Sequence, residues 1–109
     1  MIGIKGQIKL YVLTQKGPAK MIRVERKNSE KFKVTVSEQD SSTTHTVTLE
    51  DDHYQALTEG KVTKEDFVKK CFAFLLERES KESILSSFNV KVIENYFPEF
   101  EQHIKGKIG

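Results

Sequence analysis

The first half of the chain alternates between hydrophobic and polar residues. Apolar side chains recur at every second position over residues 8–12, 22–24, 32–36 and 47–49. A period of two places such residues on one face of a β-strand. Segments rich in turn-forming residues separate the four stretches, at 14–19, 27–30 and 39–42. Because such short connections join neighbouring antiparallel strands, the pattern predicts a meander of three or four strands with one buried face.

The second half changes to a helical period of about 3.6 after residue 49. Thr63 is expected to cap one helix, with Asp66 three residues on in an acidic variant of the capping box. The apolar residues within 67–76 would cover more than one face of a helix, which predicts a central helix with neighbours on two sides. Residues 83–88 are expected to form a short helical turn. The remaining helix boundaries are expected at residues that cap or break helices: Gly60, Asn89, Pro98 and Gly106.

Together these elements predict an α+β fold in which an N-terminal antiparallel meander packs on a C-terminal bundle of about four short helices. A chain of 109 residues is long enough for one core, so we expect one domain over residues 21–106. The alternation restarts at Met21, and residues 1–20 are therefore expected to form either an edge strand or a flexible arm.

Composition and cysteine usage favour a cytoplasmic protein. Hydrophobic residues make up 37% of the chain and charged residues 31%, which suits a folded domain with a well-solvated surface. The single cysteine, Cys71, cannot form an internal disulfide, as expected in a reducing compartment. No apolar run approaches the roughly 20 residues that span a bilayer, and the N-terminal apolar run lacks the features of a signal peptide.

Residues able to carry chemistry are scattered. The three histidines, His45, His53 and His103, and Cys71 lack the close spacing of a zinc site. His45 shares the parity of core residues and is expected to be a buried, neutral histidine, while Cys71 is expected to be a buried thiol with a raised pKa. The glycines lack the spacing of a phosphate-binding loop. The sequence therefore predicts no cofactor, metal or nucleotide and no enzymatic activity.

One segment near the C-terminus is a candidate protein contact. Tyr96, Phe97 and Phe100 concentrate three aromatic side chains around Pro98. They either close the core or form an aromatic contact surface for a protein partner or a weak homodimer. Arg78, which lies between two glutamates, is a candidate anchor between helices. The edge of the first strand is the other candidate contact.

A nucleic-acid interface is the alternative. Residues 1–49 hold nine lysines and arginines against four acids, while residues 50–109 hold nine against twelve. Of the basic residues in the first half, Arg23, Lys31 and Lys33 are expected on the solvent side of the sheet. The strand at 45–49, followed by a short helix, a glycine turn and a capped helix, resembles a ribbon-helix-helix repressor. That resemblance implies a dimer in which Thr44, Thr46 and Thr48 read bases in the major groove. The short first helix and the three preceding candidate strands depart from that family.

A second resemblance covers about residues 21–104. The run FAFLLERE at 72–79, followed by SIL at 83–85, Phe88, VI at 92–93 and YFPE at 96–99, resembles a small prokaryotic family of uncharacterised proteins. The resemblance implies a compact, stand-alone cytoplasmic protein. It brings no catalytic residues, and residues 1–20 fall outside it.

Overall fold

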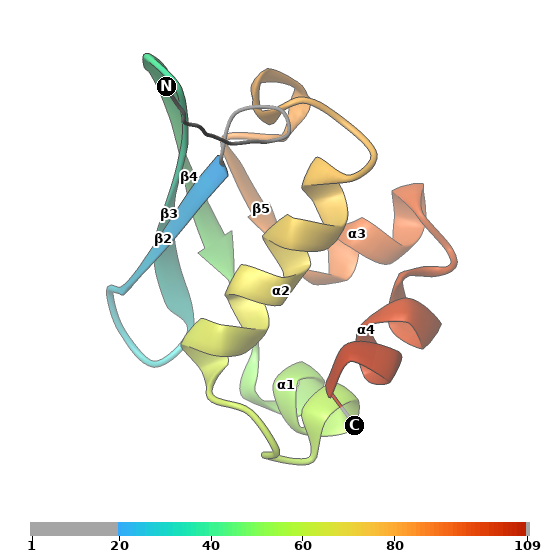
Figure 1. The fold of residues 1–109 in the computed structure, drawn as a ribbon. Coiled ribbons are helices and arrows are strands. Elements are labelled where there is room, and N and C mark those ends of the chain that lie inside the picture. Colours follow the sequence, from blue (N-terminus) through green and yellow to red (C-terminus); the bar gives the residue numbers. More distant parts are fainter. Residues whose placement is uncertain (1–19, 109) are drawn as a thin grey trace, which may run out of the picture.

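The computed structural model describes residues 20–108, which form a sheet covered on one face by helices (Figure 1). The expected alternatives for residues 1–20 lie outside this part of the chain, apart from Lys20. The elements follow in the order β2 (Lys20–Arg26), β3 (Lys31–Glu38), β4 (Ser41–Thr48), α1 (Asp51–Thr58), α2 (Lys64–Leu76), the 3-10 turn η2 (Lys81–Ser83), β5 (Ser87–Asn89), α3 (Lys91–Tyr96) and α4 (Phe100–Ile108). The α+β fold with its strands first is confirmed.

The sheet has the strand order β2-β3-β4-β5. The first three strands form the predicted antiparallel meander. In the β2–β3 turn, the Asn28 side chain accepts hydrogen bonds from the backbone N–H groups of Glu30 and Lys31, both at 2.9 Å. Strand β5 pairs in parallel with the end of β4. The prediction of a helical turn over 83–88 was wrong, because residues 87–89 complete the sheet instead.

The core lies between the inner face of the sheet and the helices. Phe32, Val34 and Val36 of β3 and Val47 of β4 are fully buried there. Helix α2 contributes six more buried side chains: Phe67, Val68, Cys71, Phe72, Phe74 and Leu75. It packs against β2 on one side and α4 on another, as predicted for the central helix. Burying each large apolar side chain contributes about 1.5–3 kcal/mol to folding.

Most helix ends follow the expected capping chemistry. The Thr63 hydroxyl accepts a hydrogen bond from the Asp66 N–H at 3.1 Å, and the Asn89 side chain accepts one from the Lys91 N–H at 2.9 Å. Helix α1 ends in two residues with positive φ, one of which is Gly60 at 75°. The predicted end at Gly106 was wrong, because α4 continues to Ile108. An exposed helix tolerates glycine at a modest cost, and the last-turn lysines suit its C-terminal dipole.

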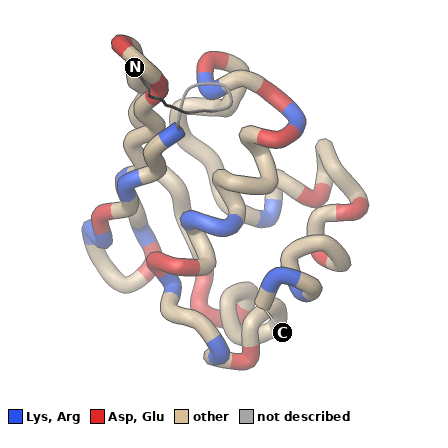
Figure 2. Tube along the Cα trace, viewed as in Figure 1, with Lys and Arg blue, Asp and Glu red and all other residues tan. Residues whose placement is uncertain are grey.

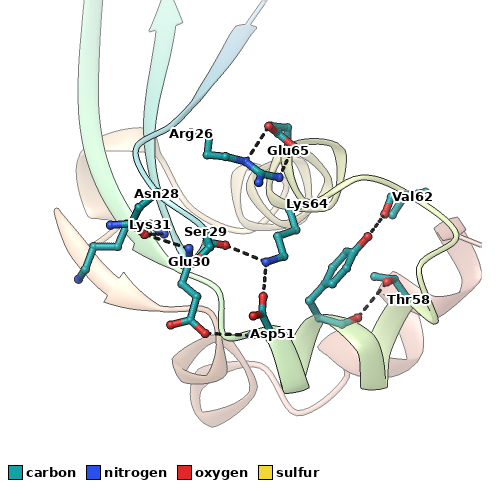
Figure 3. Close-up of polar contacts among 11 residues, drawn as sticks. Arg26, Asn28, Ser29, Glu30, Lys31, Asp51, Thr58, Val62, Lys64 and Glu65 are labelled. Atoms are coloured by element: carbon teal, nitrogen blue, oxygen red, sulfur yellow. Dashed lines mark hydrogen bonds and ion pairs between the residues drawn. The ribbon is translucent and has the colours of Figure 1, made fainter.

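A polar network ties the β2–β3 turn to the first two helices (Figure 3). Lys64 donates to the Ser29 carbonyl at 2.8 Å and forms an ion pair with Asp51. Arg26 binds both carboxylate oxygens of Glu65, at 3.0 and 3.1 Å. These contacts fix the start of α2 relative to the edge strand β2. Within residues 20–108, no helix has the length and apolarity needed to cross a membrane.

Candidate functional site

An open, mostly apolar groove of about 220 Å³ lies between the end of α2, the segment leading into β5, and α3. Its lining combines aliphatic and aromatic side chains with one serine and one carboxylate: Leu75, Glu79, Ser83, Ile84, Leu85, Phe88, Val92, Ile93, Tyr96 and Phe97. We call this surface the α2–α3 groove. It includes two of the four residues predicted to contact a partner.

Exposed hydrophobic side chains gather at this groove. The part of the chain that the structure describes has three large hydrophobic side chains that are strongly exposed: Met21 at 64%, Leu85 at 49% and Tyr96 at 67%. Leu85 and Tyr96 both line the α2–α3 groove, whereas Met21 lies on β2. The groove is therefore bordered by apolar surface that folding leaves in water.

His45 holds one wall of the groove in place. Its side chain is 2% exposed and packs beside the Phe72 ring. The Nδ1 atom lies 2.7 Å from the Leu85 carbonyl, and Nε2 lies 2.8 Å from the Thr43 hydroxyl. Because a carbonyl can only accept, Nδ1 carries the proton. His45 is buried as predicted; its hydrogen bond to Leu85 connects the wall of the groove to β4, and its contact with Thr43 lies within β4.

Arg78 connects the end of α2 to the segment that precedes α4. The Arg78 guanidinium lies 3.7 Å from the centre of the Phe74 ring, and its Nη1 donates to the Phe74 carbonyl at 3.1 Å. Its Nε donates to Glu99 at 3.1 Å. A hydrogen bond from the backbone and the Arg78 contact lower the pKa of Glu99. The Arg78 side chain is 25% exposed, and it joins the end of α2 to the segment before α4 rather than lining the groove.

The three candidate aromatic residues separate in space. Tyr96 is exposed and Phe97 is half-buried, and both line the groove. Phe100 is fully buried and contacts Phe74 edge-on, with ring centres 5.1 Å apart. Phe100 therefore closes the core and has no exposed surface to offer a partner. The prediction that these aromatic residues close the core is confirmed for Phe100, while a contact role for Tyr96 and Phe97 stays a prediction.

Sequence reasoning did not assign Ile84, Leu85, Phe88 or Val92 to the site. These residues come from a coil, a short strand and a helix, so they share no period that a pattern could reveal. At Ile84 and Leu85 the sequence does indicate one exposed hydrophobic residue. Adjacent residues of an extended segment point in opposite directions, so only one of the pair can reach the core. Ile84 is 8% exposed and Leu85 is 49% exposed.

The candidate nucleic-acid residues do share one surface, the outer face of the sheet. In the strand register, Lys31 lies opposite Thr48, Lys33 opposite Thr46, and Thr35 opposite both Arg23 and Thr44. Glu25 also lies on this face, with a carboxylate oxygen 3.9 Å from the Lys33 ammonium. Phe32 points to the core, as expected, so it cannot stack on a base from this side. Figure 2 shows basic and acidic residues interspersed along the trace.

Strand β4 does not have the geometry of a ribbon-helix-helix strand. In that family the strand pairs with the same strand of a second copy. Here β3 pairs with β4 along one edge, and β5 pairs with Thr46–Thr48 along the other. The end of β4 that leads into α1 is therefore interior, and the structure gives the DNA-binding alternative no support.

The remaining candidate chemistry is also dispersed. Over residues 20–108, no three histidine, cysteine or acidic side chains are placed to hold a metal ion. Burial raises the pKa of the Cys71 thiol, as predicted. His53 is largely buried, with Nε2 4.0 Å from Glu94, and its Nδ1 has no hydrogen-bond partner among the described residues.

Comparisons with protein-family models, with curated proteins and with solved structures gave no match to this chain. Both family resemblances noted in the sequence therefore stay predictions.

Proposed function

We propose that this chain is a non-enzymatic interaction module that binds a segment of another protein in the α2–α3 groove. The observation that carries the proposal is the placement of Leu85 and Tyr96, two of the three strongly exposed hydrophobic side chains in residues 20–108, on one apolar groove. Exposed apolar surface beside a groove favours a binding role, because burying it on association is stabilising. Tyrosine is also among the residues enriched at interface hot spots.

The size and charge of the groove support a polypeptide partner. Sites for drug-sized molecules measure roughly 300–1,000 Å³, whereas this groove has about 220 Å³. That volume suits one or two side chains of a larger partner. Glu79 is the one charged residue in the lining. The partner we infer carries an apolar anchor residue with a lysine or arginine close by.

The walls of the groove support the same proposal. His45 fixes the Leu85 carbonyl from one side, and the Thr46 N–H donates to the Ser86 carbonyl at 2.8 Å. Near the other side, Arg78 joins the end of α2 to Glu99, which follows the groove residues Tyr96 and Phe97 in the chain. A preformed wall lowers the ordering cost of binding. We place this module in the cytoplasm because its single cysteine suits a reducing compartment.

A peptide-selection experiment tests the groove directly. Short random peptides would be selected on the wild-type protein, and their dissociation constants would be measured for Tyr96→Ala and Leu85→Ala variants. Each variant is expected to bind about tenfold more weakly, a loss of about 1.4 kcal/mol typical of an interface anchor. Met21→Ala is the matched control, because the exposure of Met21 lies between those of Leu85 and Tyr96 but the residue is on β2.

The charge of the groove gives a second readout. Selected peptides should be rich in basic residues next to their apolar anchor, and Glu79→Lys should reverse that preference. Peptides with a basic residue beside an apolar anchor that bind both groove variants as tightly as wild type would contradict the proposal. So would selected peptides whose binding is lost in Met21→Ala alone.

A further inference from the structure

A second groove runs along the edge of the sheet, between β2 and α2. It is open, has a volume of about 560 Å³, and its lining includes Ile22 and Val24 of β2 and Val62, Glu65 and Lys69 from the α2 side. Ile22 and Val24 are half-buried, so their apolar faces remain partly accessible. The bidentate contact of Arg26 with Glu65 fixes the spacing between the strand and the helix. This surface is separate from the α2–α3 groove.

The hydrogen-bonding direction of β2 follows from the turn. The Lys27 N–H donates to the Lys31 carbonyl at 2.8 Å, so odd-numbered residues of β2 direct their backbone groups toward β3. Alternate residues of a strand direct these groups to opposite sides. The N–H and C=O groups of Ile22 and Val24 therefore point away from β3. Among residues 20–108, β2 pairs with no strand other than β3.

We propose that the β2 edge binds an extended segment of a partner protein by strand addition. The added strand would exchange backbone hydrogen bonds with Ile22 and Val24 and place two aliphatic side chains in the groove beneath α2. Recognition of this kind takes affinity from the main chain and specificity from alternate side chains. Unpaired backbone groups at an edge favour such pairing.

The positive charge of Arg23 predicts which residue the partner strand carries between its two aliphatic residues. That residue lies opposite Arg23, on the outer face of the sheet. The ion pairs of β2 among the described residues use Arg26 and Glu25, and neither uses Arg23. An aspartate or glutamate in the partner segment would satisfy Arg23. Residues 1–19 of this chain hold three lysines and no aspartate or glutamate, so they do not provide this acid.

The test uses the full chain and a blocked, labelled peptide with a Val-Asp-Val centre. Fluorescence anisotropy would measure its affinity, and hydrogen exchange would follow the amides of Ile22 and Val24. We expect both amides to exchange quickly in the isolated protein and slowly with peptide bound. Methylation of the two valine amide nitrogens should abolish binding, because it removes the donors that pair with the strand edge.

A charge exchange distinguishes this mode from nonspecific binding. Arg23→Glu should weaken binding of the Val-Asp-Val peptide about threefold to tenfold, as a cross-strand attraction becomes a repulsion. The same variant should strengthen binding of a Val-Lys-Val peptide. Lys31→Glu is the matched control, because Lys31 shares the outer face but lies on β3, and it should leave both affinities unchanged.

Three results would overturn the proposal. The first is no detectable binding of the Val-Asp-Val peptide to the wild-type chain. The second is binding that survives N-methylation or ignores Arg23→Glu. The third is slow exchange of the Ile22 and Val24 amides in the isolated protein, which would show that the same chain or a second copy already covers the edge.

Discussion

A buried and a partly buried histidine illustrate how the surroundings of a residue determine its role. His45 hydrogen-bonds through both ring nitrogens and connects β4 to the wall of the α2–α3 groove. His53 has no partner for Nδ1 among the described residues and only a distant contact with Glu94 at 4.0 Å. The first histidine holds Leu85 in the wall of the groove. The second is expected to make stability depend on pH, because burial lowers its pKa.

We expect the fold to lose stability as the pH falls below about 6.5, the ordinary pKa of histidine. Burial lowers the pKa of His53 and outweighs the opposing attraction of Glu94. Above that pH, folded and unfolded chains both hold neutral His53. Below it the unfolded chain takes up a proton while the folded chain does not. The free energy of unfolding therefore falls until the pH reaches the folded-state pKa. Urea unfolding at several pH values would measure the decline.

The substitution His53→Asn removes the titrating group and should flatten this decline from about pH 6.5 down to the lowered folded-state pKa of His53. The carboxylates Glu65 and Glu50 affect stability at lower pH than His53 does. Contacts with Arg26 and Lys91 lower the pKa values of Glu65 and Glu50, so their contribution is present above pH 4.5 and is lost as pH falls through their folded-state values. A decline of unchanged slope in His53→Asn would show that another group is responsible.

At the scale of elements, local pattern predicted the strands and helices that have strong local signals. Strands β2 to β4 alternate over several residues, and α2 combines a capping threonine with a long apolar face. Strand β5 has three residues, and its partner in β4 lies about 40 positions earlier in the chain. Its pairing depends on tertiary contact rather than on sequence period, so the pattern favoured a helical turn there.

The candidate site also divides into residues with a local sequence signal and residues placed by tertiary contacts. Tyr96 and Phe97 were predicted because aromatic residues beside a proline stand out locally. Leu85 was not, because its exposure depends on His45 holding the Leu85 carbonyl to a strand far away in sequence. The sequence could not separate Phe100 from its neighbours either. Its burial follows from the position of Phe74 on α2.

The central position of α2 predicts the effect of a core substitution. Leu75 is 5% exposed and belongs to the same core cluster as Val34, Val36 and Val47. Leu75→Ala should lower the free energy of unfolding by about 2–5 kcal/mol, through lost transfer energy and a residual cavity. Leu76→Ala, at the half-buried neighbouring position, is the matched control and should cost clearly less. Equal losses measured by urea unfolding would contradict the orientation of α2.

For the molecule as a whole, α2 supports two surfaces at different places along its length. Leu75 lines the α2–α3 groove near the helix end, and Glu79 lines it just beyond. Glu65 and Lys69 line the edge groove nearer its beginning. Apart from the exposed Met21, the outer face of the sheet is polar and mixed in charge, and the helices lie on the opposite face (Figure 1). The two grooves thus both lie beside one helix.

The most direct measurement of the central claim is a chemical-shift map of the full chain with a selected peptide that carries a lysine or arginine beside an apolar anchor, the motif proposed for the α2–α3 groove. The account predicts that the methyl signals of Leu75, Leu85 and Val92 shift on binding, since all three line the α2–α3 groove. The methyl signals of Ile22 and Val24, in the edge groove, should stay unchanged. Binding that shifts only residues outside the α2–α3 groove would contradict the account.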